Sequence, residues 1–512
     1  MNNKRKKNVI NVIFFAFVSS SLLIACEESK QSKSDPLTRA DLIIKNVRIA
    51  SAEQSQASIP SDVAIKNGKI IAIEKAGENI LTESDEVIDG GNYFLSPGLI
   101  DGHTHLYSIP GMRADQEAKF PEIAQAAREQ IPLSYLYFGF TTIVDLNSNS
   151  ALIQQWNEAA LRPQAYFCGA APIIDGYPTN NIPKPIRYAV TPNYLVEDPA
   201  SYPDLENFDP TAHTAKAVAE NIDASGAICI KTHYESGFGG RGDLPIPSIT
   251  LIQNLVAEAH LRKLPVLLHA NSQEAQQFGL ETGVDAIVHG MWSWADNTET
   301  ELTPGVTTIL ENIINRKIGW QPTMQVLYGE RDLHDPDYLA QVELQHALPQ
   351  SLIEWYGSDE GRWLQKRVSA TPYISQHLQS GNWQSIDAEA IQRVKASLSF
   401  IAEHKGLLLF GSDTPSDATY ANPPGFNGRL EILRWQQSGV SAQQLFEAAT
   451  INNAKFFGLD DRLGTVEVGK QADLLLLRKN PLLDYGAYDN IEVVIVNGKA
   501  LSREQLSATS RN

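Results

Sequence analysis

Histidine, lysine and aspartate side chains end several short apolar runs of this 512-residue sequence, and these residue types are able to bind metal ions or move protons. His103 and His105 close the run FLSPGLIDGHTHL. Two residues apart on a strand, they point to the same side, so both imidazoles can address one ion. Later runs end in the same way, with Lys231 in AICIKTHY, His269 in VLLHA, His289 in AIVHG and Asp413 in LLLFGSDT. A lone histidine at a strand end is usually structural, but six such groups over five strand ends favour one functional site.

The central sequence alternates short apolar strands with longer helical stretches, which is the pattern of βαβ units. Eight strands are predicted, at 95–101, 141–146, 164–170, 227–233, 265–269, 285–289, 317–323 and 407–413. Eight parallel strands with intervening helices imply a (β/α)8 TIM-type barrel, and reactive groups in such a barrel lie at the carboxyl ends of the strands. We therefore assign residues 96–455 to a barrel domain of the α/β class. Long insertions at 172–210 and 325–390 are expected to shape its mouth.

The two ends of the folded chain have a different texture, with alternating apolar residues and tight turns at Asn67-Gly68 and Asn497-Gly498. The stretches 39–95 and 456–505 are expected to pair into one small β-sandwich, with the barrel inserted between its halves.

The N-terminus resembles a bacterial lipoprotein signal. A basic start, a short apolar run and small residues predict a signal peptide over 1–25, and LIAC resembles a lipobox whose Cys26 becomes the acylated first residue. The run is too short and too rich in serine for a membrane span. Residues 26–38 are polar and aperiodic and are predicted to form a tether. We expect a protein of the bacterial cell envelope, facing the periplasm or the exterior, whose one membrane contact is this anchor. A plain signal peptide with an incidental cysteine is the alternative, and the choice of membrane stays open.

Composition limits the possible partners. The net charge of −18, from 42 basic and 60 acidic residues, argues against nucleic acid. Cys168 and Cys229 form no Cys-x-x-Cys motif, so a thiol redox site is not supported, and two buried thiols are expected. The partner is expected to be a small-molecule substrate, and the sequence leaves the oligomeric state open.

These motifs, together with the closing GTVEVGKQADLLLL, resemble the amidohydrolase superfamily over nearly all of the mature chain, and most of all its imidazolonepropionase-like and prolidase-like branch. The resemblance implies one ion held by His103, His105, Lys231 and Asp413, and a second held by Lys231, His269 and His289. Lys231 would then be a carbamate formed with carbon dioxide, because an ammonium has no lone pair to offer. Imidazole and carboxylate ligands suit Zn²⁺ best, so two zinc ions per chain are expected.

The implied activity is hydrolysis of C–N bonds in peptide-like or cyclic amides, including Xaa-Pro or Xaa-Arg dipeptides. A metal-activated hydroxide would attack the carbonyl, and Asp413 would carry its proton to the leaving nitrogen. His233, Arg241 and Tyr177 are the candidate substrate-binding residues. His233 lies further along the strand of Lys231, Arg241 lies in a Gly-rich loop after it, and Tyr177 lies in the first long insertion.

Two other interpretations stay open. The first is a mononuclear hydrolase or deaminase of the same fold, with His103, His105, His269 and Asp413 around one ion. The second is a surface lipoprotein that binds ligands without catalysis, although no position of the metal set has decayed.

Overall fold

A computed structural model describes residues 39–53, 56–78, 83–198, 208–238, 242–416 and 418–511. The expected signal peptide, the tether with Cys26, and Arg241 lie outside these residues. No helix within the described ranges is both long and apolar enough to cross a membrane.

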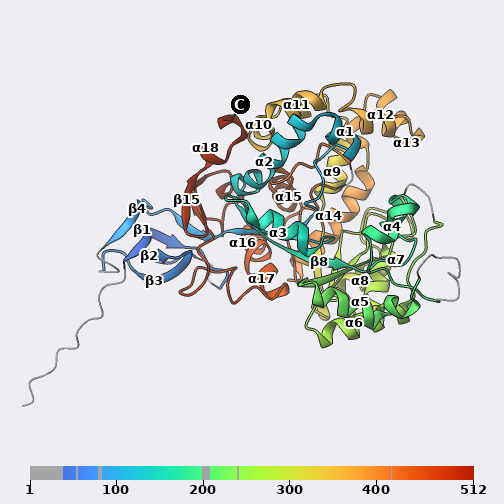
Figure 1. Cartoon of the computed structure of the whole chain (residues 1–512), viewed down its shortest axis with the longest axis horizontal. Helices are drawn as coiled ribbons and strands as arrows, with labels where there is room; N and C mark the ends of the chain where they lie inside the picture. The colour runs from blue at the N-terminus through green and yellow to red at the C-terminus, as the bar shows by residue number, and fades with distance from the viewer. Residues whose placement is uncertain are drawn as a thin grey trace, which may run out of the picture. The chain divides into compact units, whose positions relative to one another are not determined.

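Strands from the two chain ends pair in one sheet (Figure 1). They are β1 (Ala40–Ile49), β2 (Pro60–Lys66), β3 (Lys69–Lys75), β4 (Ser84–Asp89), β5 (Phe94–Pro97), β13 (Leu474–Leu477), β14 (Ile491–Val496) and β15 (Lys499–Ser502). Their order is β15-β14-β13-β5-β1-β2-β3, with β4 also beside β1. β13 joins the halves, because it runs antiparallel to both β5 and β14. The chain ends therefore share a sheet, whereas the finer prediction of two sheets packed as a sandwich is not confirmed.

The second sheet is the barrel. Its seven assigned strands are β6 (Leu99–Thr104), β7 (Phe140–Asp145), β8 (Gln164–Ala170), β9 (Cys229–His233), β10 (Val266–His269), β11 (Ala286–Val288) and β12 (Gly319–Gln321). They pair in sequence order, and every pair is parallel. The eighth predicted strand, 407–413, is not assigned as a strand, but this segment bonds to both edges of the sheet. Leu409 N donates to Trp320 O of β12, and Gly102 N of β6 donates to Phe410 O. The TIM-like barrel is confirmed.

The first predicted barrel strand, 95–101, is wrong at its boundaries. Its residues belong to β5 of the end sheet and β6 of the barrel, because the backbone changes partners in between. Gly98 N donates to Asp473 O, whereas Leu99 N donates to Gly139 O next to β7. A continuous apolar run hides this change of partner.

Helices follow the barrel strands and fill the insertions. They are α1 (Ala114–Lys119), α2 (Pro121–Tyr137), α3 (Ser150–Glu158), α4 (Lys184–Val190), α5 (Ala215–Ala224), α6 (Ile249–Leu261), α7 (Gln273–Thr282), α8 (Pro304–Asn315), α9 (Gln325–Asp332), α10 (Val342–Ala347), α11 (Gln350–Tyr356), α12 (Trp363–Ser369), α13 (Pro372–Gln379), α14 (Ala388–Glu403), α15 (Phe426–Gln437), α16 (Ala442–Glu447), α17 (Asn453–Phe456) and α18 (Arg503–Leu506). Local sequence sets their ends: α7 begins where the Ser272 side chain accepts a bond from Ala275 N, and it stops at Gly283, whose φ is 76°. The 325–390 insertion folds into α9–α13.

Inside the barrel, an apolar cluster that includes Ile100, Val144, Leu267 and Leu409 forms the floor beneath the strand ends. Cys168 and Cys229 belong to this cluster and form a disulfide between β8 and β9, so the expectation of two free thiols is wrong. The reason is their register, since the two residues are direct neighbours on adjacent parallel strands. That register depends on a pairing 61 residues apart in sequence, which spacing alone does not reveal.

Candidate metal centre

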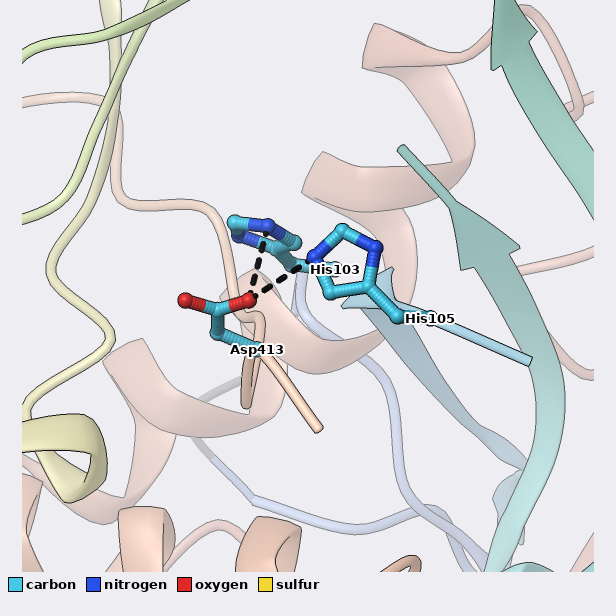
Figure 2. A group of neighbouring side chains, drawn as sticks. All are labelled: His103, His105 and Asp413. Carbon is cyan, nitrogen blue, oxygen red and sulfur yellow. Dashed lines mark hydrogen bonds and ion pairs between the residues drawn. The ribbon is translucent and has the colours of Figure 1, made fainter. Parts of the chain in front are cut away.

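The first half of the candidate site consists of His103, His105 and Asp413 (Figure 2). The two histidines lie at the end of β6, and the aspartate ends the segment 407–413. Asp413 Oδ1 lies 3.1 Å from His103 Nε2 and 3.0 Å from His105 Nε2. One ligand atom from each residue lies within 4.8 Å of the others. Gly411 permits this approach, since a Cβ there would stand 2.7 Å from that of His103. Two neighbouring histidines and an aspartate that lies 308 residues after His105 are thus arranged as a cation would require.

The second half consists of Lys231, His269 and His289. Lys231 is the middle residue of β9, His269 is the last residue of β10, and His289 follows β11. The rings of His269 and His289 lie 4.4 Å apart, and the ring of His289 lies 5.5 Å from that of His103. His289 Nδ1 also lies 3.8 Å from Asp413 Oδ2. Five of the six predicted metal-site residues therefore lie at or just beyond the carboxyl ends of the barrel strands or of the segment 407–413, and the sixth, Lys231, lies two residues before the end of β9.

The backbone at two of these residues adopts conformations that L-residues rarely use. His289 has φ 80° and Asp413 has φ 54°. Val288, the residue before His289, faces the barrel floor, so regular alternation would turn His289 outward. The positive φ breaks this alternation. Strained residues of this kind concentrate at functional sites.

Sequence reasoning missed three groups that contact ring nitrogens of the histidines. Thr323 Oγ1 lies 2.7 Å from His289 Nδ1, and Glu235 Oε2 lies 3.4 Å from His269 Nε2. Asp145 Oδ1 lies 3.8 Å from His105 Nδ1. Partners of this kind fix the ring orientation of metal-binding histidines. Asp145 ends β7, so the strand-end rule that found the other groups would have found it too.

Burial sets the protonation of the basic groups. It lowers the pKa of His103 and of His289 well below the usual value, and it lowers that of His269. Neutral imidazoles keep the lone pair that a metal needs. Burial also lowers the pKa of Lys231 to about 7, although the charge of Asp413 opposes the shift.

His105 behaves differently from the other histidines. Burial works against its charge, yet its contacts with Asp145 and Asp413 raise its pKa to about 9. An ion that binds at His105 Nε2 must therefore displace a proton near neutral pH.

Asp101 supports the first half from below. It is fully buried and accepts bonds from Ser412 N, at 2.9 Å, and Ser412 Oγ, at 2.5 Å. Burial raises the pKa of Asp101 to about 7, although the bonds from Ser412 lower it. Because Ser412 precedes Asp413, these bonds fix the backbone that carries the site carboxylate.

Two of the three predicted substrate-binding residues, His233 and Tyr177, lie on the side of the second half. His233 is buried, with its ring 5.7 Å from that of His269, and the half-buried Tyr177 lies 4.9 Å from His269. Arg241 lies outside the described residues, so its role stays a prediction.

The donors present fit a divalent cation. The first half offers two imidazoles and a carboxylate around one point. Lys231 is 3% exposed, and within the described part of the chain its Nζ has no hydrogen-bond partner. A buried, unpaired amine is costly unless it is neutral or modified, and a carbamate would turn this position into an anionic oxygen donor.

Fold and site together define an α/β barrel protein with metal-ligand side chains at its mouth. The model of the Amidohydrolase family matches residues 94–293 and 404–501, which is more than half of the chain. The chain belongs to the amidohydrolase family, as the sequence motifs predicted.

Matches to the curated relatives cover less than half of this chain and of each relative. Adenine deaminase of Listeria innocua is 38% identical over 81 residues, which cover 16% of this chain and 13% of that enzyme. The likeness therefore concerns a small part of that relative.

Solved structures match over nearly the whole chain. An amidohydrolase superposes with a TM-score of 0.64 at 18% identity, covering 90% of this chain and 98% of that one. A prolidase complexed with N-methylphosphonate-L-proline gives 0.61 at 19% identity, covering 90% and 99%. Ochratoxinase of A. niger gives 0.60 at 18% identity, covering 90% and 95%. At these identities the likeness establishes the fold.

Proposed function

We propose that this protein is a metal-dependent hydrolase of C–N bonds in peptide-like or cyclic amides, with two divalent ions, expected to be zinc, per chain. The observation that carries the proposal is the first half of the site, where His103, His105 and Asp413 present their ligand atoms within 4.8 Å of one another. The family and the names of the structural neighbours, which include a prolidase, support amide substrates.

The residues of the chain divide the work. His103, His105 and Asp413 would hold a divalent ion, which would supply Lewis-acid chemistry: polarisation of an amide carbonyl and a water whose pKa falls to roughly 7. Asp413 orients that water, accepts its proton through the carboxylate, and returns the proton to the leaving nitrogen. Asp145, Thr323 and Glu235 keep the imidazoles in place during this exchange.

Lys231 acts as a carbamate in this proposal. The Nζ lone pair forms a bond to the carbon of CO₂, and the nitrogen loses a proton, which leaves an anionic group with two oxygens. Its pKa of about 7 keeps much of the amine neutral and nucleophilic at physiological pH. His233, Tyr177 and Arg241 are proposed to contact the substrate.

The test is a substrate screen on zinc-reconstituted protein lacking residues 1–26. Dipeptides, with Xaa-Pro and Xaa-Arg among them, and cyclic amides are assayed for release of an amine, before and after chelation. Turnover that disappears with chelator and returns with Zn²⁺ supports the proposal. Amide turnover that survives metal removal contradicts it, and so does the absence of turnover across the screen.

The short match to adenine deaminase favours one alternative, a deaminase with a single ion. The same preparation distinguishes the two. A deaminase releases ammonia from an aminated heterocycle such as adenine, holds one ion per chain and does not need Lys231. The hydrolase cleaves amides, holds two ions and loses one of them when Lys231 is replaced.

We also propose that the protein is exported and lipid-anchored through Cys26. The disulfide between Cys168 and Cys229 supports export, because disulfides persist mainly in oxidising compartments. In a bacterial host, the full chain should incorporate labelled fatty acid and fractionate with membranes, and Cys26→Ala should do neither. Labelling of the Cys26→Ala variant would contradict the anchor.

A further inference from the structure

Three aromatic residues, Tyr177, Phe238 and Trp292, form an aromatic wall beside the second half of the site. The Phe238 ring lies 5.2 Å from that of Tyr177 and 6.4 Å from that of Trp292. Tyr177 lies 4.9 Å from the His269 ring, and Trp292 lies 5.5 Å from the His289 ring. The wall thus borders the two histidines that the second ion would use.

The wall comes from three separate loops at the carboxyl end of the barrel. Tyr177 follows β8, Phe238 follows β9 and Trp292 follows β11. Its residues are far apart in the chain and meet only because the strand ends converge.

A hydrogen-bonded network ties the wall to the site. Glu235 accepts from Gly237 N, at 2.7 Å, and from Asn271 Nδ2, at 2.9 Å. Asn271 O in turn accepts from Trp292 N, at 2.7 Å. The same Glu235 carboxylate contacts His269. The backbone beside Phe238 and the backbone of Trp292 are therefore positioned by the groups that hold a site histidine.

Fold stability accounts for Trp292, which packs against the main hydrophobic core, but not for the other two rings. Neither Tyr177 nor Phe238 belongs to a hydrophobic core cluster of the described residues, and 44% of Phe238 is exposed. A single exposed apolar ring needs no explanation. Three contacting rings anchored beside candidate metal ligands do, and aromatic linings are typical of sites that accept apolar groups.

We propose that the aromatic wall selects substrates that carry an aromatic or large apolar side chain next to the scissile amide. This inference deepens the proposed function and rests on it, because the bound molecules are substrates only if the protein is the proposed hydrolase. Contact of an aromatic side chain with the three rings removes apolar surface from water on both sides, which favours phenylalanine over alanine by about tenfold or more.

The test is a binding measurement on metal-free protein, which separates recognition from turnover. N-acetyl-L-phenylalaninamide and N-acetyl-L-alaninamide are titrated by calorimetry into wild type, Phe238→Ala and Tyr373→Ala. Phe238 and Tyr373 are matched in exposure, at 44% and 49%, but Tyr373 lies on α13 and its hydroxyl bonds to Asp387 N. Because Phe238 is half exposed, its replacement should leave the fold intact, which circular dichroism checks.

The expected result is a Kd ratio of at least about ten in favour of the phenylalanine compound in wild type and Tyr373→Ala, falling to about two in Phe238→Ala. A wild-type ratio near one, no binding of either compound, or an unchanged ratio in Phe238→Ala would overturn the inference. Selective binding in a protein that never shows metal-dependent turnover would contradict the proposed function but would support the aromatic wall as a recognition surface.

Discussion

The two halves of the candidate site are held in different ways. In the first half, Asp413 lies within 3.1 Å of both His103 and His105, so a carboxylate joins the two imidazoles, and it pairs with the charge that His105 carries in the metal-free protein. The second half, Lys231, His269 and His289, consists of three bases and has no carboxylate among its members. Burial keeps these bases largely neutral, and partners outside the half orient the two histidines.

This difference indicates why β9 carries a lysine, Lys231, beside these histidines. A cation in the first half finds a carboxylate among its own three ligands, whereas the three ligands of the second half include none, and the nearest carboxylates, Glu235 and Asp413, contact the histidines from outside that half. A carbamate on Lys231 would supply the missing anion and share it between both ions. Substitution of a residue that belongs to one half alone should therefore impair metal binding in that half and not in the other.

Replacing Asp413 should have the largest effect, because this residue serves both halves. Asp413→Asn keeps the size of the side chain but removes its charge and its ability to carry a proton. We expect kcat/KM to fall by about a thousandfold or more in zinc-loaded protein. Asp359→Asn, at an exposed position, is the control and should behave as wild type. Activity within tenfold of wild type in Asp413→Asn would refute the shared role.

Replacing Lys231 should empty one half only. In Lys231→Met, the metal content measured by mass spectrometry should fall from two ions per chain to one. The affinity for the second ion should fall by more than the roughly 10–100-fold that is typical when a residue hydrogen-bonded to a metal ligand is replaced. Wild type incubated with ¹³C-bicarbonate should show a carbamate carbon signal that the variant lacks. Two ions per chain in Lys231→Met would show that the halves do not differ in this way.

Smaller, matched effects are expected from the carboxylates behind the histidines. Asp145→Asn should lower the affinity for the first ion, and Glu235→Gln should lower the affinity for the second, each by roughly 10–100-fold. Each substitution removes the anion that orients one imidazole. Competitive titration with a chelator measures both affinities in both variants. If either variant lowers the affinities for both ions equally, the two halves bind metal as one unit, which would contradict the difference between them.

The strand ends made most of the candidate site predictable from sequence. His103, His269, His289 and Asp413 each follow an apolar run, and the parallel barrel brings such ends together whatever the loops do. The functions of these residues stay predictions, but their convergence needed only the periodicity of the strands.

Other features depended on contacts that a single sequence does not display. Glu235 reaches His269 because a loop turns back after β9, and Thr323 reaches His289 because both residues leave regular strand geometry, with φ 44° and 80°. The disulfide required the register of β8 against β9. The boundary between β5 and β6 required knowledge of which sheet each residue pairs with. Each of these features is a tertiary contact or a backbone irregularity, which strand periodicity does not encode.

The smallest expected effect is on the pH dependence of the unfolding free energy, which should have opposite signs for His105 in the first half and Lys231 in the second. In metal-free protein, the pKa of His105 is raised to about 9 from 6.5, because Asp145 and Asp413 outweigh burial, so its stabilising charge is present at low pH and is lost as pH rises toward 9. Burial lowers the pKa of Lys231 to about 7 from 10.5, so its contribution is present at high pH and is lost as pH falls toward 7. Between pH 7 and pH 9 the two slopes oppose each other.

Urea unfolding in the presence of chelator should therefore give a shallow pH dependence in wild type. Lys231→Met leaves the His105 slope, so the unfolding free energy should fall as pH rises, by at most about tenfold in the unfolding constant per pH unit. His105→Gln leaves the Lys231 slope and should show the opposite trend over the same range. Parallel slopes in the two variants would mean that neither half titrates as its surroundings dictate, and the electrostatic contrast between the halves would be lost.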